Sequence, residues 1–284
     1  MSLYKYFKPD RLDVLTSGRI RYSQPAAFND PFEGRPYYKG FADVSSLEKR
    51  YPQRFDRLVI EHYQSLSPEL RNSIPQEDFI QMLEHLRPET YEIFRHVSKS
   101  FVPKINAMMH KSFTDGIGVL SLTEVRDNLL MWSHYAESHT GFVVEFDEKH
   151  KCFGPKSDNP DEWWRLHKVR YEDERPHTTV IELDFTAILL TKGRAWEYEK
   201  EWRVFRPLNK AVAVVEAKPF NIHLFDYPPA CIRGVIMGAR MPLEERRLFW
   251  KAIRQNPAFS HVRLYQANID ERRYSLKIWK IGSS

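Results

Sequence analysis

Short apolar or alternating stretches recur along the chain and predict a core of β-strands. These stretches are Leu3–Phe7, Ile117–Leu122, Gly141–Phe146, Glu201–Phe205 and Arg233–Met237. Each is bounded by residues that favour turns, which is the pattern of a strand at least half buried on a packed sheet. We therefore expect all five strands to lie in one core.

A helical period replaces this pattern between about residues 44 and 113. Phe79, Met82, Leu83 and Leu86 follow one another at the spacing i, i+3, i+4, i+7. That spacing places apolar side chains on one stripe of a helix, where they can pack against a neighbour. The segment is therefore predicted to be a helical insertion that covers a face of the sheet.

The turn that follows the second predicted strand, Ile20–Ser23, carries polar side chains. Asn29 and Asp30 stand directly before a proline. Asn and Asp bond to the nearby backbone, and the proline forces the residue before it into an extended conformation. Two interpretations stay open: a plain turn, or a polar tip of Asn29, Asp30 and Glu33 that faces a pocket.

Neither an internal repeat nor a low-complexity linker divides the sequence. Runs of strands with one helical block are typical of an α+β fold. We predict a single α+β domain over residues 1–284. Its mixed, mostly antiparallel β core would form two small sheets around a cleft, with the helical cap at about 44–113.

Composition narrows the class of protein only a little. The chain has 284 residues, 42% of them hydrophobic, and a formal net charge of +5. Because Lys and Arg are spread along the chain, a nucleic-acid partner is possible and is not indicated. The two cysteines, Cys152 and Cys231, lack the spacing of a disulfide framework or a zinc site.

The chain shows no sign of export or membrane insertion. Its first residues contain no apolar signal core, and no run of eighteen apolar residues occurs anywhere. We expect a cytoplasmic protein without a membrane partner.

The stretch from Thr191 to Arg206 concentrates acidic and aromatic side chains. If the chain is extended from about Glu199, then Glu199, Glu201 and Arg203 share one face of a strand. Glutamate is disfavoured in strands, so this crowding needs a reason. Taken alone, the stretch favours a solvated edge strand with a Glu–Arg pair. The alternative is a site where carboxylates converge.

A second dense segment surrounds the predicted helix Leu129–Ala136. His134 and Tyr135 lie on this helix, and His139 follows in a loop. His134 and His139 are five residues apart, so one helix face cannot present both to a metal. No His-Glu-x-x-His motif occurs. We expect no metal site here, and a single histidine in such a place is more often structural.

An alternative hypothesis concerns the end of the predicted strand Gly141–Phe146. Asp147 precedes Lys149 by two residues. Paired carboxylates can hold magnesium while a lysine steadies the attacked phosphate, as in metal-dependent nucleases. The spacing is short and common, so a nuclease is kept as an alternative.

Five motifs together resemble a widespread bacterial family that is known as a domain of unknown function. They are Tyr4-Lys-Tyr6, Phe28-Asn-Asp-Pro-Phe-Glu33, Met131-Trp-Ser-His-Tyr-Ala136, His139-Thr-Gly-Phe142 and Trp196-Glu-Tyr-Glu-Lys-Glu-Trp-Arg203. The resemblance runs over essentially the whole chain and is weakest between about Phe41 and Phe113. It implies no particular activity.

The order of elements is also distantly similar to that of ADP-ribosyltransferases. Those enzymes hold the nicotinamide–ribose part of NAD in a cleft, and a glutamate at the start of a late strand stabilises positive charge as nicotinamide leaves. The resemblance assigns this role to Glu201, with Glu199 orienting the acceptor.

The same resemblance places Tyr4, Lys5 or Tyr6 at the first-strand position that binds NAD as a substrate, and Ser121 at the middle-strand position. The hypothesis of a shared site adds further residues to the predicted NAD-binding set, namely Ser23, Asn29, Asp30, His134 and Tyr135. The sequence departs from the family pattern at two points. The usual His or Arg is missing from the first strand unless Lys5 replaces it, and the usual Ser-Thr-Ser is missing around Ser121.

Three hypotheses about function follow. The first is an NAD-consuming ADP-ribosyltransferase or glycohydrolase, with phage defence as one setting and an unknown small-molecule or macromolecular acceptor. The second is the magnesium-dependent nuclease, and the third is a non-catalytic binding module. A shared site predicts that the loop Asn29–Glu33, the helix Trp132–Tyr135 and the pair Glu199 and Glu201 line one concavity.

Overall fold

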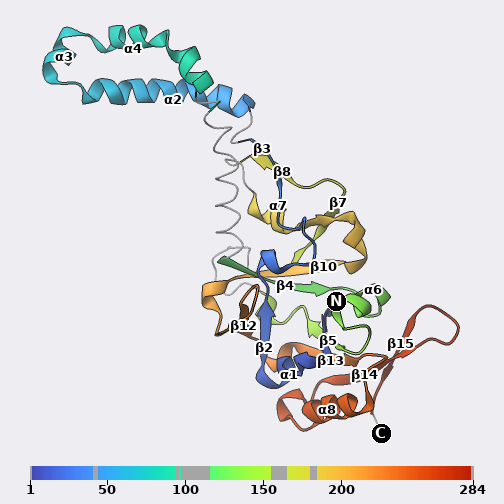
Figure 1. Cartoon of the computed structure of the whole chain (residues 1–284). Helices are drawn as coiled ribbons and strands as arrows, with labels where there is room; N and C mark the ends of the chain where they lie inside the picture. The colour runs from blue at the N-terminus through green and yellow to red at the C-terminus, as the bar shows by residue number, and fades with distance from the viewer. Residues whose placement is uncertain are drawn as a thin grey trace. The chain divides into compact units, whose positions relative to one another are not determined.

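The computed structural model describes residues 2–40, 44–93, 96, 116–154, 165–179 and 184–282. The chain divides into two compact units (Figure 1). The sheet unit comprises residues 1–34, 113–175 and 186–284, and the helical unit comprises residues 35–112 and 176–185.

One eight-stranded sheet organises the sheet unit. Its order is β15-β14-β13-β5-β1-β4-β10-β6. The strands are β1 (Ser2–Phe7), β4 (Ile117–Thr123), β5 (Phe142–Asp147), β6 (His167–Lys168), β10 (Glu201–Pro207), β13 (Ile232–Met237), β14 (Arg263–Ile269) and β15 (Leu276–Lys280). Strands β13 and β14 run parallel, and the other neighbours are antiparallel. The five strands predicted from the sequence form the consecutive centre of this sheet, which confirms their common core.

Both faces of the sheet are covered. Successive side chains on β1 point to opposite faces, and each face packs against its own core. Leu3 and Phe7 join a large core with apolar residues of α1 (Asp13–Ser17) and α8 (Leu243–Arg254). Helices α1 and α8 lie side by side on this face (Figure 1). Tyr4 and Tyr6 join a smaller core with α6 (Leu129–Tyr135), where the Tyr6 ring meets the Trp132 ring edge-on at 5.4 Å.

Three smaller sheets contain the remaining strands among the described residues. They are β11-β12-β2 (Ala213–Val215, Ile222–Asp226 and Arg19–Tyr22), the parallel pair β7-β9 (Arg170–Glu172 and Thr191–Gly193) and the parallel pair β3-β8 (Tyr37–Gly40 and His177–Thr179). The α+β class and the mostly antiparallel pairing are therefore confirmed. The arrangement differs from the expected two small sheets, because the five central strands join β6, β14 and β15 in one eight-stranded sheet.

The helical unit contains α2 (Val44–Ser65), α3 (Pro68–Ser73) and α4 (Gln76–Glu84). Phe55, Val59 and Phe79 form its buried core. Met82, predicted on the same apolar stripe as Phe79, is exposed. Part of the predicted helical segment, residues 94–95 and 97–113, lies outside the described residues. That the segment caps a sheet face, within a single domain, stays a prediction.

Within the described ranges, no helix combines the length and apolar character that crossing a bilayer requires. Both Cys152 and Cys231 are free thiols.

Gly141 is fixed by close packing where the chain enters β5. Its amide donates to the Ala136 carbonyl at 2.8 Å, and its own carbonyl accepts from the Gly238 amide at 2.9 Å. An added Cβ would collide with the Phe7 carbonyl and would lie 3.1 Å from the Ala136 Cα. We expect Gly141→Ala to lower the free energy of unfolding by about 1–3 kcal/mol, the usual cost of overpacking, as measured by urea denaturation.

Gly116→Ala is the matched control, because a Cβ there has no neighbour within 4 Å. Equal denaturation midpoints for the two variants would contradict the packing argument.

Candidate functional site

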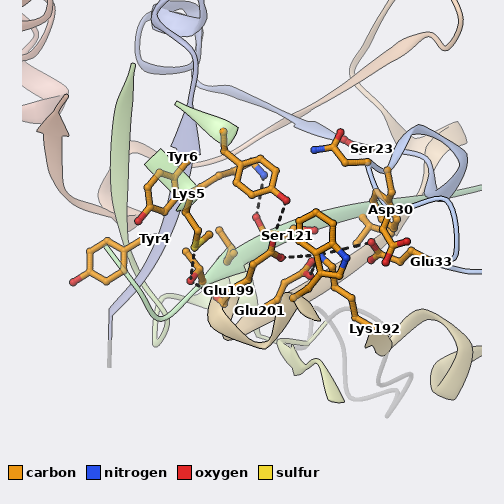
Figure 2. A pocket seen from close by; sticks show the side chains of 18 of the residues that line it. Tyr4, Lys5, Tyr6, Ser23, Asp30, Glu33, Ser121, Lys192, Glu199 and Glu201 are labelled. Atoms are coloured by element: carbon orange, nitrogen blue, oxygen red, sulfur yellow. Dashed lines mark hydrogen bonds and ion pairs between the residues drawn. The ribbon is translucent and has the colours of Figure 1, made fainter. Parts of the chain in front are cut away.

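A polar pocket of about 250 Å³ opens in the sheet unit beside β1 and β4. The two strands pair at a single position, Tyr4 opposite Thr123. Further along β4, Ser23 pairs with Val119 instead. The Ser121 carbonyl on β4 accepts a hydrogen bond from the Lys5 amine at 2.9 Å. The pocket therefore forms where β1 and β4 stop pairing (Figure 2).

Ten of the residues singled out in the sequence line this one pocket. They are Tyr4, Lys5, Tyr6, Ser23, Asn29, Asp30, Ser121, Tyr135, Glu199 and Glu201. Glu33 also lines it, so the loop Asn29–Glu33 and the two glutamates converge as predicted. Placement in the pocket does not test their chemical roles, which stay predictions.

His134 lies outside the pocket, which corrects its predicted position. Helix α6 lines the cavity with Met131 and Tyr135, and His134 is exposed. The reason is the helical period, because residues four apart share a face and His134 points elsewhere. Trp132 is fully buried, and its indole nitrogen donates to the Arg126 carbonyl at 2.9 Å.

The acidic stretch takes a different path from the predicted strand. Glu199 ends a 3-10 helix, Arg194–Glu199, and β10 begins only at Glu201. Lys200 between them is in the left-handed conformation, with φ of 44°. Glu199 and Glu201 are 3% and 4% exposed. The solvated-edge interpretation is wrong, since β10 pairs with β4 on one side and β6 on the other.

Lys192 joins the two glutamates and is the residue that the sequence reasoning missed. Its amine lies 2.6 Å from Glu199 Oε2 and 3.1 Å from Glu201 Oε2 (Figure 2). Lys192 sits on β9, which runs parallel to β7. Burial lowers the pKa of Lys192, but the charges of Glu201 and Glu199 outweigh burial and raise that pKa above its ordinary value. The available signal was the presence of three glutamates, Glu197, Glu199 and Glu201, in one short stretch, because any of them that is buried needs a cation.

Arg203 extends the network on the other side of Glu201. Its Nε donates to Glu201 Oε1 at 2.8 Å, and its Nη2 donates to Glu201 Oε2 at 2.9 Å. The same guanidinium is paired with Glu33 and bonded to the Leu189 carbonyl. Arg203 is fully buried. Such burial is tolerated only because each charge meets an opposite charge.

Tyr135 closes the network at its far end. The hydroxyl donates to Glu199 Oε1 at 2.6 Å. Burial, reinforced by the charge of Glu199, raises the pKa of Tyr135. The phenol is therefore held neutral as a hydrogen-bond donor. Burial also raises the pKa of the Glu201 carboxyl, against the opposing effect of Lys192.

The pKa of Lys5 is shifted in the opposite direction from that of Lys192. Burial lowers the pKa of the Lys5 amine to about 8, although Glu201 acts in the opposite direction. We expect Lys5 to react with an amine-acylating reagent in its neutral form, with half-maximal rate near pH 8. An ordinary lysine has a pKa of about 10.4, so it would still be gaining reactivity well above that pH.

Peptide mass spectrometry after short exposures at several pH values measures this profile. The exposed Lys8 in the same digest calibrates the reagent. A Lys5 rate that keeps rising above pH 9 would contradict the lowered pKa.

The nuclease residues lie apart from this pocket. Asp147 ends β5, and its Oδ1 accepts from Arg233 Nη2 at 2.8 Å and from the Lys149 amide at 3.0 Å. Across the residues that the structure describes, no group of three or more His, Cys, Asp or Glu side chains could hold a metal ion. The nuclease stays an untested prediction.

Comparison with known protein families finds a match over one segment of the chain. Residues 131–204 match a family described as "Protein of unknown function (DUF2971)". The segment runs from α6 into β10 and includes Tyr135, Lys192, Glu199, Glu201 and Arg203. The match supports the resemblance to a domain of unknown function. No curated protein and no solved structure matches the chain.

Proposed function

We propose that the pocket is the active site of an enzyme that cleaves the bond between nicotinamide and ribose in NAD, either as an ADP-ribosyltransferase or as a glycohydrolase. One observation carries the proposal. Glu201, at the start of β10, shares a single pocket with Tyr4 and Tyr6 of the first strand and with Ser121 of β4. These are the positions that the distant resemblance assigns to NAD.

The charge of the site favours a ligand with positive character. Four carboxyl groups and three cations lie in or against the pocket: Asp30, Glu33, Glu199 and Glu201, with Lys5, Lys192 and Arg203. The acids are in excess, and Lys5 loses its charge as the pH rises through about 8. The nicotinamide ring of NAD is cationic, and its departure creates positive charge on the ribose. A fixed excess of carboxylate stabilises both.

Aromatic side chains supply the second part of the fit. Five of them line the pocket: Tyr4, Tyr6, Phe28, Tyr135 and Trp196. Aromatic faces attract cations and stack on planar rings. At about 250 Å³ the cavity is slightly smaller than the usual range of ligand pockets, about 300–1,000 Å³. It suits the nicotinamide–ribose half of NAD, with the pyrophosphate and adenosine outside.

The reaction breaks the bond between ribose C1′ and the ring nitrogen of nicotinamide. The electron pair of that bond leaves with nicotinamide and neutralises its ring. Glu201 stabilises the positive charge left on the ribose, and an acceptor oxygen or nitrogen then bonds to C1′ and gives up its proton. Glu199, held by Tyr135 and Lys192, is placed to orient the acceptor or take that proton.

Incubation of the pure protein with NAD tests the proposal. Release of nicotinamide, followed by proton NMR, is the expected result, and its loss in Glu201→Gln ties the release to this pocket. Binding of NAD without release would make the protein a binding module. Cleavage of plasmid DNA with magnesium, lost in Asp147→Asn, would favour the nuclease.

A further inference from the structure

A second cavity lies on the sheet unit at the hairpin that joins β14 and β15. It measures about 570 Å³, within the usual range for ligand pockets. The turn of this hairpin, residues 270–275, forms one wall. Arg240 and His139 contribute to the other. None of these residues lines the first pocket.

The cavity carries an excess of exposed positive charge. Arg240, Arg272 and Arg273 line it, and all three are exposed. Among the residues that the structure describes, none of the three arginines forms an ion pair. Asp270 does not neutralise them, because its Oδ2 is already paired with Lys277 at 3.1 Å. Glu271 is the remaining acid in the lining.

Hydrogen bonds order the backbone that carries the three arginines. Asp270 Oδ1 accepts from the amides of Arg272 and Arg273 at 2.8 and 3.1 Å, which organises the turn. On the opposite wall, the Arg240 amide donates to the His139 carbonyl at 2.9 Å.

His139 is itself held in an uncommon conformation. It ends a run of three non-glycine residues with positive φ, which begins at Glu137. Its ring is parallel to Trp132 within 7° at 6.2 Å. Consecutive left-handed residues persist only where their surroundings enforce them, and they cluster at functional sites.

Tyr274 places an aromatic ring at the edge of this charged surface. Its exposure is 101%, so the ring contacts nothing that shields it from water. Large exposed aromatic side chains beside arginines are typical of surfaces that bind single-stranded nucleic acid. There the bases stack on the ring, while the guanidinium groups contact the phosphates.

We infer that the β14–β15 hairpin, with Arg240, Arg272, Arg273 and Tyr274, is a docking surface for single-stranded nucleic acid. The arginines bind backbone phosphates and Tyr274 stacks on a base. The formal net charge of +5 for the whole chain is in keeping with a polyanionic partner. The surface is independent of the proposed NAD chemistry.

Fluorescence anisotropy with the full chain tests this surface, using labelled oligo(U) and oligo(dT) of about 15 nucleotides, near the upper end of known single-strand site sizes. We expect the combined variant Arg240→Ala, Arg272→Ala, Arg273→Ala to weaken binding at least tenfold. Three lost phosphate contacts should also make the slope of log affinity against log salt shallower by about 2. Tyr274→Ala should weaken binding by about tenfold with little change in that slope.

The matched control removes three positive charges from exposed positions of α8, by Arg247→Ala, Lys251→Ala and Arg254→Ala. It should bind like the unaltered chain, and melting temperatures establish that each variant is folded. Equal loss in both triple variants would mean attraction by net charge alone and would overturn the assignment. So would the absence of binding to either oligonucleotide, or duplex DNA that binds equally well and is insensitive to Tyr274→Ala.

Discussion

Replacing Arg203 with methionine is expected to destabilise the protein by about 3–5 kcal/mol, the usual result of removing one partner from a buried ion pair. Methionine retains much of the apolar length of arginine, so the change acts mainly on charge. It leaves Glu33 with only the longer contact to Lys192 at 3.8 Å, and Glu201 keeps only Lys192. The variant should unfold at a clearly lower temperature in circular dichroism or calorimetry.

Arg247→Met is the control for loss of an arginine in general. Arg247 pairs with Glu244 at 2.7 Å, but both side chains are largely exposed. Pairs of that kind contribute about 0–1 kcal/mol. A small effect at both positions would show that the Arg203 network is not a buried charge cluster. Recovery of stability in the double variant Arg203→Met, Glu33→Gln would show that the Glu33 carboxylate, deprived of its close partner, causes the loss.

Under the proposed cleavage of NAD, Glu201→Gln is expected to lower the rate of nicotinamide release by about a hundred- to a thousand-fold, the effect of losing one preorganised electrostatic partner. The swap keeps the shape of the side chain and removes its charge. Lys192 remains paired with Glu199, and Arg203 remains paired with Glu33. The melting temperature should therefore fall less than in Arg203→Met.

Glu197→Gln provides a control within the same segment, because Glu197 is exposed and lies outside the pocket. Rate and melting temperature are compared in each variant. If Glu201→Gln retained full activity, Glu201 would have no part in the reaction. A rate that falls only in proportion to the folded fraction would make Glu201 a structural charge.

The sequence was sufficient to place the five central strands and most of the residues that line the pocket. Gly141–Phe146 and Arg233–Met237 are apolar and short enough to be strands wherever their neighbours lie. The turn chemistry of Asn29 and Asp30 also marked a polar loop that does reach the pocket. These features depend on local pattern, which one sequence contains.

The errors arose where the outcome depends on distant pairing. Nothing in the spacing of Glu199 and Glu201 shows whether β10 lies at an edge or between two neighbours. Lys192 becomes a partner of both only because β9 pairs with β7 and the left-handed Lys200 turns the chain. His134 was assigned by the density of its segment, and the helix period turns it away from Tyr135.

The pocket forms where β1 and β4 stop pairing, so it requires strands that lie far apart in the sequence. The family match covers residues 131–204, which include Tyr135, Lys192 and Glu201. Yet β5 lies between β1 and β13, and β10 pairs with β4. The partner strands β1, β4 and β13 all lie outside that segment. A fragment cut to the matched residues would present open strand edges and would lack Glu33. The smallest portion that can build this pocket therefore extends from the first strand to at least β10, well beyond the residues that the family match covers.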